Sequence, residues 1–332
     1  MAYTTIDNPE LYFQTKLFTG NGSTQSLTLD GDEDMQPDLL WFKQRDGTGN
    51  HAVFDSVRGT TGSVYRRLFP ESSDAEDTAA NTLTAIGSDG FTVGSDGNIN
   101  GSSETMVAWN WKAGTSFSND ASATSIGTID SSGSVNTDAG ISIVSYTGNS
   151  TSGASIKHGL SSAPKFVFGK ARNTSGEDWF TGHASNGFDK YIKLNSTHAV
   201  QTYSGVFNDT APNTSIVTLG SNGLSNSSSY NYIMYCFADV KGYSKFGSYT
   251  GNNDADGTFV YTGFRPAFVI CKITSGVDNW IIMDSKRLGY NEANYQLIAN
   301  SSLADQTPVR ADLLSNGFKA RSTNGEVNNG SY

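Results

Sequence analysis

Short apolar runs alternate with turns rich in Gly, Asn, Asp and Ser along the chain, and this pattern predicts β-strands. One run recurs with the same punctuation: it opens on Pro, continues through apolar residues and closes on Lys. The copies lie at residues 37–43, 164–170 and 266–272. Proline fits the first position of a strand because no backbone donor is needed there, and the residues after it fit a core strand. The recurrence predicts three copies of one structural unit.

Two further features follow in each copy, in the same order. A second strand is predicted at residues 51–56, 179–182 and 280–285. A tight turn with the pattern Ser-Asp-Gly or Ser-Asn-Gly comes next, at residues 88–90, 221–223 and 315–317. Asp-Gly and Asn-Gly are strong hairpin signals because a type I′ turn needs positive φ at both central residues. An ordered set of strands and turns that occurs three times indicates an internal repeat.

The copies also share their two ends. Each opens on a segment that contains Thr-Gly-Asn, at residues 19–21, 147–149 and 250–252. The first two close on an aromatic strand, at residues 105–111 and 230–238, whereas the third reaches Tyr332 where that strand should begin. We therefore expect a truncated chain or a missing last strand, with an unpaired edge in the third core that another chain would have to cover.

Each copy spans roughly a hundred residues, which suits a two-sheet sandwich and exceeds the ~20–50 residues of a propeller blade or solenoid repeat. The predicted fold is all-β, with three tandem lectin-like or jelly-roll β-sandwich modules. The modules are assigned to residues 14–113, 140–243 and 244–332, the last without its closing strand. Residues 1–13 are predicted to be an N-terminal leader or anchor. The Ser/Thr/Gly-rich residues 114–139 are a connector with room for a strand.

Composition agrees with this fold and narrows the possible partners. Charged residues make up 16% of the chain, Gly occurs 36 times, and the formal net charge is −10. An acidic surface repels phosphate, so no nucleic acid is expected as a partner. No run approaches the ~20 apolar residues that membrane insertion requires. The N-terminus lacks the basic and apolar segments of a signal peptide. Cys236 and Cys271 lie in apolar runs and are interpreted as core residues.

Sequence motifs for catalysis are missing: there is no G-x-S-x-G elbow, no phosphate-binding loop and no H-E-x-x-H. The four histidines lack metal-ligand spacing and are interpreted as partly buried or surface residues. Asp55 with Arg58, and Asp284 with Arg287, follow the second strand of the first and third copies, where the second copy has His183 instead. An ion pair that fixes a loop is favoured here over a ligand site. We expect a protein that is not an enzyme.

The one cofactor that the sequence leaves open is calcium. Asn252, Asp254 and Asp256 offer oxygen ligands at alternate positions, before a glycine that permits a sharp bend. A helical calcium loop needs Glu at its twelfth position, where this chain has Gly263. A solvated hairpin turn is therefore the favoured interpretation, and no other cofactor is expected.

The closing strands carry the candidate binding residues, which are all aromatic: Trp109, Trp111, Tyr230, Tyr232 and Tyr235. Because neighbouring positions of a strand point to opposite faces, some of these rings face outward unless another element covers them. Outward Tyr and Trp can stack on sugar rings or fill a protein interface. Packing against neighbouring strands or sister modules is the alternative, and we favour it.

Several motifs resemble those of structural proteins of marine tailed bacteriophages. They are AGISIVSYTGN at residues 139–149, KHGL at 157–160, APKF at 163–166, GYSKFGSY at 242–249 and NWIIMDSKR at 279–287. The resemblance extends over all three copies, from about Tyr12 to the end of the chain. These are strand and turn motifs, so they identify a family without implying any catalytic residue.

The resemblance implies a virion structural protein, made in the host cytoplasm, that acts as a tail fibre or appendage adhesin in host attachment. A capsid (head) decoration or head-fibre protein is the alternative, and a hydrolytic tailspike is a distant one. The implied partners are other virion proteins and a host surface glycan or protein. By analogy with phage fibres and decorations, we expect a homo-oligomer and suggest a trimer.

Overall fold

The structure is a computed structural model that describes residues 4–287 and 290–332. Strands make up 37% of the chain and helices 5%, and the strands form several antiparallel sheets. The predicted β fold is confirmed at this level. No helix among the described residues is long and apolar enough to cross a membrane.

Two main sheets make up the first repeat (residues 14–113), in the orders β1–β9–β3–β4 and β2–β8–β7. Their strands are β1 (Phe13–Thr19), β2 (Gln25–Leu27), β3 (Leu39–Gln44), β4 (Ala52–Asp55), β7 (Leu83–Gly87), β8 (Gly90–Val93) and β9 (Thr105–Trp111). The smaller elements are the 3-10 helix η1 (Pro9–Leu11), the hairpin β5 (Thr60–Thr61) and β6 (Val64–Tyr65), and α1 (Gly97–Asn100). Phe42 forms edge-to-face contacts with Phe54 and Phe91 in the core between the sheets.

The second repeat (residues 140–243) contains most of a larger sheet, in the order β10–β11–β12–β19–β14–β15–β16–β17, and the pair β13–β18. The strands of the repeat are β12 (Ile141–Thr147), β13 (Ser155–Lys157), β14 (Phe166–Ala171), β15 (Phe180–His183), β16 (Lys190–Lys193), β17 (Gln201–Thr202), β18 (Ile216–Thr218) and β19 (Asn231–Phe237), with helix α3 (Ser204–Phe207). The predicted connector supplies β10 (Thr115–Asn119), α2 (Ala121–Thr124) and β11 (Ser131–Asn136). It is therefore an ordered extension of this sheet.

The third repeat (residues 244–332) has the sheets β21–β22–β23 and β20–β25–β24. Their strands are β20 (Phe259–Tyr261), β21 (Phe268–Lys272), β22 (Trp280–Asp284), β23 (Leu297–Ile298), β24 (Ala311–Leu314) and β25 (Gly317–Ala320). Ile281, Met283 and Phe318 belong to the core between them. Residues 244–250, which correspond to β1 and β12, form no strand.

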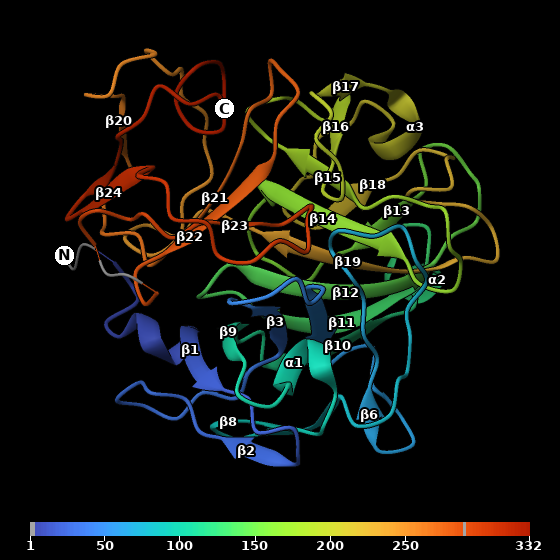
Figure 1. Ribbon diagram of the computed structural model, residues 1–332. Coiled ribbons are helices and arrows are strands. Elements are labelled where there is room, and N and C mark those ends of the chain that lie inside the picture. The colour runs from blue at the N-terminus through green and yellow to red at the C-terminus, as the bar shows by residue number, and fades with distance from the viewer. Residues whose placement is uncertain (1–3, 288–289) are drawn as a thin grey trace.

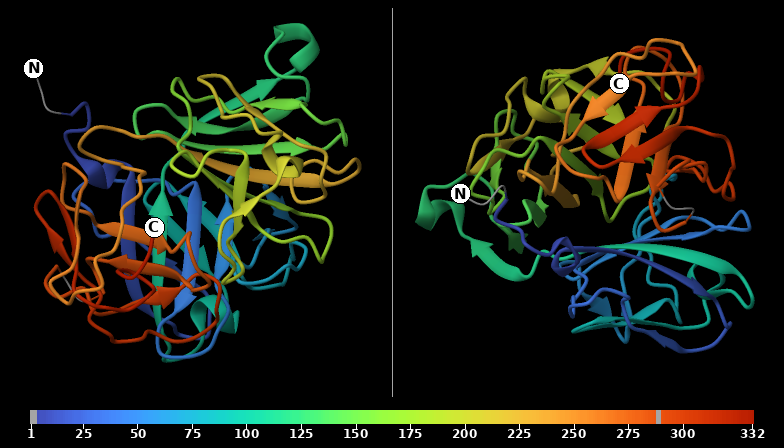
Figure 2. Two further views of the ribbon diagram at one scale, coloured as in Figure 1. Left: turned by 90° about the horizontal axis from the view of Figure 1, so that it is seen from above. Right: turned by 90° about the vertical axis from the view of Figure 1, so that its left-hand side faces the viewer.

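The three repeats form three lobes around a common centre, as the views in Figures 1 and 2 show. In Figure 1 the first repeat (blue to teal) lies at the bottom, the second (green to yellow) at the upper right and the third (orange to red) at the upper left. Apolar side chains from all three repeats meet in one cluster, which includes Trp41, Trp109, Phe168, Tyr235 and Ile282. We call this cluster the central core.

The central core explains why the Pro-to-Lys runs are continuously apolar instead of alternating. In β3, Leu40 and Phe42 belong to the core between the sheets of the first repeat, while Leu39 and Trp41 belong to the central core. Successive side chains of a strand point to opposite faces, so a strand that is covered on both faces needs apolar residues throughout. Every residue of β14 is likewise buried.

A buried asparagine ties the opening turn of each repeat to the end of that repeat. The Oδ1 atoms of Asn100, Asn226 and Asn328 accept hydrogen bonds from the backbone N–H groups of Asn21, Asn149 and Asn252, at 3.1, 2.9 and 3.1 Å. The turn lies close to the segment that it contacts, because a Cβ atom on Gly148 would lie 2.3 Å from the carbonyl oxygen of Ser227. The recurring Thr-Gly-Asn pattern therefore has a structural cause.

The described part of the predicted leader packs against the rest of the protein. The side chain of Ile6 is buried. The ring of Tyr12 makes an edge contact with Tyr243 of the second repeat, with 6.0 Å between the ring centroids. Residues 1–3 of the leader lie outside the described residues.

Candidate functional site

The repeats meet at three junctions that use the same backbone contact. At each junction a backbone N–H group of one repeat donates to a backbone carbonyl oxygen of the neighbouring repeat. The accepting residue lies two positions after the Lys that closes the Pro-to-Lys run. The three pairs are Asp305 to Arg45 (2.6 Å), Glu76 to Arg172 (2.7 Å) and Val200 to Thr274 (3.2 Å). The first repeat thus contacts the third, the second contacts the first and the third contacts the second, which closes a ring.

Each junction also contains a hydrogen bond between a side-chain ring nitrogen of one repeat and a backbone carbonyl oxygen of the other. The donors and acceptors are Trp179 Nε1 with the Phe69 carbonyl (2.8 Å), Trp280 Nε1 with the Lys193 carbonyl (2.9 Å) and His51 Nε2 with the Ile298 carbonyl (3.0 Å). His51 directly precedes β4 as Trp179 directly precedes β15, so it occupies the tryptophan position of the first repeat. Its Nδ1 accepts from Trp41 Nε1 at 2.8 Å, which leaves the proton on Nε2.

Two of the three junctions contain a buried bond from an aromatic ring to a carboxylate. Tyr235 Oη donates to Asp55 Oδ2 at 2.6 Å. Trp109 Nε1 donates to Asp284 Oδ2 at 3.0 Å. The predicted ion pairs are confirmed at the same aspartates, with 2.5 Å between Arg58 Nε and Asp55 Oδ2 and 2.6 Å between Arg287 Nε and Asp284 Oδ2. Each of these two carboxylates thereby has both a cationic partner and an aromatic hydrogen-bond donor in the interior.

His183 takes the place of these aspartates at the third junction. It lies opposite Phe166 in the β14–β15 ladder, as Asp55 lies opposite Leu39 and Asp284 lies opposite Phe268. Its Nδ1 accepts from the backbone N–H of Ser185 at 3.1 Å, so its proton lies on Nε2. Burial lowers the pKa of His183, which favours the neutral ring.

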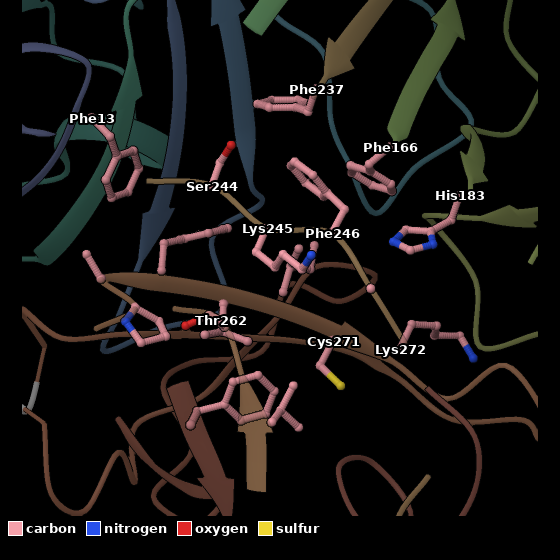
Figure 3. A pocket seen from close by; sticks show the side chains of 18 of the residues that line it. Phe13, Phe166, His183, Phe237, Ser244, Lys245, Phe246, Thr262, Cys271 and Lys272 are labelled. Atoms are coloured by element: carbon pink, nitrogen blue, oxygen red, sulfur yellow. The ribbon is translucent and has the colours of Figure 1, made fainter. Parts of the chain in front are cut away.

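A cavity of about 760 Å³ lies beside His183 and is lined by residues of all three repeats. Figure 3 shows Phe13, Phe166, Phe237 and His183 on one side of it, and Cys271 on β21 across from them. The lining is mainly aromatic and aliphatic, and it also includes polar and charged residues such as Glu10, Asp30 and Lys245. Apolar surface that is gathered in one concave site is the usual mark of a binding site, so we take this cavity as the candidate functional site.

Strand β21 is less covered than its counterparts because its free edge borders this cavity. Phe268, Val269 and Ile270 are partly exposed, whereas all residues of β3 and β14 are buried. Phe268 and Ile270 pack against the edge of the central core. The cavity therefore continues the central core into the third junction.

Three buried lysines close the recurring strands, and sequence analysis assigned them no role. Lys43, Lys170 and Lys272 each donate from Nζ to the carbonyl oxygen of the following residue, at 2.6, 3.0 and 2.7 Å. Burial lowers the pKa of all three to about 8. The Lys272 side chain is visible beside the cavity in Figure 3. The common hydrogen bond gives this residue a structural role at the strand end.

The aromatic candidates for binding lie mostly inside the protein. Trp109, Tyr232 and Tyr235 have no exposed surface. Trp111 and Tyr230 are partly buried against the central core and the core of the second repeat. Rings without exposed surface cannot stack on a ligand from solvent, and Trp111 alone among the five lines the cavity.

The candidate calcium residues form a network of turn contacts. Asn252 Oδ1 accepts from the backbone N–H of Asp254, and Asp254 Oδ1 accepts from that of Asp256. The Asp256 carboxylate pairs with Lys319 at 2.5 Å. Among the described residues, no three His, Cys, Asp or Glu side chains are grouped so that they could hold a metal ion.

Two of the four histidines are more deeply buried than the sequence predicted, and the two cysteines are buried as predicted. His51 and His158 have no exposed surface, which corrects the expectation of partly buried or surface residues for these two. His183 is partly buried and His198 is exposed. Cys236 and Cys271 are both buried free thiols, which confirms their interpretation as core residues.

The chain belongs to a family that is described as a domain of unknown function (DUF7483), whose model matches residues 8–332. The match spans all three repeats as one domain. No curated protein and no solved structure matched the chain.

Proposed function

We propose that the protein is a non-enzymatic structural component of a tailed-phage particle. The observation that carries this proposal is the use of the recurring residues. Asn226, Lys170, Trp179 and the Asp284–Arg287 pair, each with at least one counterpart in another repeat, are buried or nearly buried and take part in internal hydrogen bonds. A repeat that preserves framework residues and no reactive group suits a structural protein.

The proposed place in the virion rests on the strand and turn motifs that resemble those of marine phage structural proteins. We propose a tail fibre or appendage adhesin that contacts the host surface. A capsid decoration or head-fibre protein is the alternative. The hydrolytic tailspike ranks lowest because the repeats span roughly a hundred residues and show no β-helix period.

Surface aromatics favour a contact role for the outer part of the third repeat. Phe259 and Tyr261 lie on the edge strand β20 and have 42% and 63% of their surface exposed. Tyr290 is 46% exposed, and Arg265 lies over its ring at 4.5 Å. Exposed Tyr and Phe next to Arg are the residue types that dominate protein contacts. We propose this surface, in place of the buried rings of β9 and β19, as the contact with a host glycan or with another virion protein.

We also propose that the repeats are three tandem β-sandwich modules of the lectin or jelly-roll type, with the boundaries given above. Support comes from the first and third repeats, where two sheets enclose an apolar core. Because all three repeats contribute to the central core, we propose that the modules form one closed ring and not a row of separate domains. Homo-oligomerisation, as a trimer, remains part of the proposal by analogy alone.

Immunogold labelling of intact virions, with an antibody against this chain, tests the proposed function. Gold on the tail or fibre tips supports the adhesin, and an even coat on the head supports the decoration protein. Absence of label from virions whose lysates contain the protein would contradict both. For the adhesin, purified protein should coat susceptible cells and slow phage adsorption.

A further inference from the structure

The junction between the first and second repeats contains a row of side chains whose charges alternate in sign. Arg58 pairs with Asp55 in its own turn, and its Nη1 lies 3.8 Å from Oε2 of Glu76. Glu76 in turn accepts two hydrogen bonds from Arg172 of the second repeat, at 2.9 and 3.0 Å. The Glu76 and Arg172 side chains are nearly buried. The row therefore crosses from one repeat into the next.

The junction between the third and first repeats contains the same row. Arg287 pairs with Asp284 in its own turn, and its Nη1 lies 2.6 Å from Oδ1 of Asp305. Oδ2 of Asp305 accepts a hydrogen bond from Nε of Arg45, in the first repeat, at 2.8 Å. Asp305 also provides the backbone N–H of its junction, as Glu76 does at the first one. Hydrogen bonds between charged groups are roughly twice as strong as neutral ones.

The junction between the second and third repeats lacks this row of charges. The matching positions are fixed by the strand ladder, by the spacing of three residues after it and by the backbone contact of the junction. In chain order they are occupied by His183, Asn186, Val200 and Thr274. None of these residues is an acid or an arginine. The backbone contact, from the Val200 N–H to the Thr274 carbonyl, is also the longest of the three at 3.2 Å.

A short connecting turn holds the second and third repeats near each other. Val240 and Ser244 exchange backbone hydrogen bonds at 3.0 and 2.9 Å, and Oδ1 of Asp239 accepts from the Phe246 N–H at 2.8 Å. One ion pair among the described residues joins these repeats, between Lys245 and Asp239, and it lies on this turn, spans 3.7 Å and is partly exposed. A short tether keeps two surfaces at a high effective concentration even while they are apart.

We propose that the ring of repeats opens reversibly at the junction between the second and third repeats, while the other two junctions stay closed. Separation of either charged junction takes Arg172 or Arg45 away from a nearly buried carboxylate. Close charge pairs across an interface strengthen it measurably in double-mutant cycles. Separation of the neutral junction breaks no nearly buried ion pair, so it needs less free energy, and the connecting turn brings the two surfaces together again. Local openings occur where the free energy of opening is lowest.

The opening uncovers part of the central core at one defined place. Val200 of the second repeat and Trp280 of the third both contribute to this core. Trp280 Nε1 donates to the Lys193 carbonyl across the same junction at 2.9 Å, so this bond is lost when the repeats separate. The opening depends on contacts within the chain alone and not on the proposed function.

Hydrogen exchange of matched N–H groups in the full chain, followed by NMR, tests the opening. The backbone N–H groups of Glu76, Asp305 and Val200 make the equivalent contact at the three junctions. After correction for intrinsic rates, we expect Val200 to exchange about ten-fold faster than the other two. The indole N–H of Trp280 should likewise exchange faster than that of Trp179, which donates across the first junction at 2.8 Å. Equal protection at all junctions, or fastest exchange at Glu76 or Asp305, overturns the proposal.

Removal of one charge shows whether the row keeps a junction closed. Arg45→Thr gives the junction between the third and first repeats the residue type that Thr274 provides at the neutral one. We expect exchange of the Asp305 N–H to rise about ten-fold, while that of the Glu76 N–H stays unchanged because its junction is intact. Circular dichroism checks that the variant is folded. An unchanged rate at Asp305 overturns the proposal.

Addition of a charge pair provides the converse test, and it is independent of whether Arg45→Thr folds. Val200→Glu combined with Thr274→Arg places an acid and an arginine where the other two junctions have them. The pair should slow exchange of the Trp280 indole N–H, which neither substitution alters directly. Thr274→Arg alone is the matched control and should not slow it, since its arginine has no acid to meet. Equal exchange in the single and the double variant overturns the proposal.

Discussion

The phenolic hydroxyl of Tyr235 donates a 2.6 Å hydrogen bond to Oδ2 of Asp55, across the junction between the second and first repeats. The same carboxylate pairs with Arg58 at 2.5 Å, and both charged side chains are fully buried. One carboxylate therefore neutralises a buried cation, fixes the turn after β4 and joins two repeats. Its counterpart Asp284 does the same with Arg287 and Trp109.

Removing this carboxylate should destabilise the protein strongly. In Asp55→Asn the guanidinium of Arg58 stays buried without its counter-ion, and breaking a buried pair in this way costs about 3–5 kcal/mol. We expect a loss of that size in the free energy of unfolding, measured by urea denaturation. Asp189→Asn is the matched control, because the Asp189–Lys190 pair is partly exposed to solvent and should contribute within ~1 kcal/mol. A loss below that of the control would show that the Arg58 charge finds another partner.

Buried histidines should make the protein sensitive to acid. Burial lowers the pKa of His158 to about 4 and that of His51 to about 3, below the value of about 6.5 in the unfolded chain. The unfolded state then binds protons more readily, so stability is complete above pH ~6.5 and falls as the pH drops through ~4. Unfolding free energies measured from pH 7.5 to 4 should decrease accordingly.

The variant His158→Gln isolates the contribution of His158. The difference in unfolding free energy between the parent protein and this variant should shrink as the pH falls, because the variant has no ring to protonate. The comparison is needed because burial raises the pKa of Glu71 to about 7, and this group changes stability in the opposite direction between pH 4.5 and 7. Parallel profiles for parent and variant would contradict the assignment.

The buried lysines should make the stability of the folded protein depend on pH in the alkaline range. Burial lowers the pKa of Lys170 to about 8 from 10.5, so the unfolded state holds the proton over this interval and stability should rise with pH from ~8 upward. Lys170→Met keeps the apolar stem and removes the amine. We expect the parent to gain stability relative to this variant between pH 7.5 and 9.5 in denaturant titrations. A constant difference over that range would mean that the amine is not desolvated in the folded state.

Truncation of the buried asparagine that binds the opening turn should destabilise the protein. Asn226 accepts from Asn149 N–H and donates to the carbonyls of Thr151 and Gly220, at 2.9, 2.9 and 2.7 Å. Asn226→Ala removes these bonds and leaves buried backbone groups without partners, so we expect a loss of about 2–4 kcal/mol by thermal or urea unfolding. The exposed Asn329→Ala provides the control and should change stability by less than ~0.5 kcal/mol. Equal effects would indicate that water replaces the Asn226 contacts.

Local features of the fold were predictable from the sequence because they depend on residues close together in the chain. The Pro-to-Lys runs contain β3, β14 and β21, and the Asp-Gly turn before Phe91 is the β7–β8 hairpin. Asp284 and Arg287 lie three residues apart and form the predicted ion pair. Strand pattern, the position of this turn and a short-range pair follow from backbone conformational preferences, which act within a few residues.

The candidate site depends on contacts that no local pattern contains. Strand alternation places Trp109 and Tyr235 on one face, but it does not say that a sister repeat covers that face. Trp109 meets Asp284 across 175 positions of the chain, and His51 meets Ile298 across 247. His183 could be aligned with Asp55 from the repeats alone, yet its place at the cavity follows from the packing of the three repeats around the central core. Sequence by itself determined the repeated strands and turns, and the tertiary structure decided which faces are buried, because burial depends on where distant segments meet.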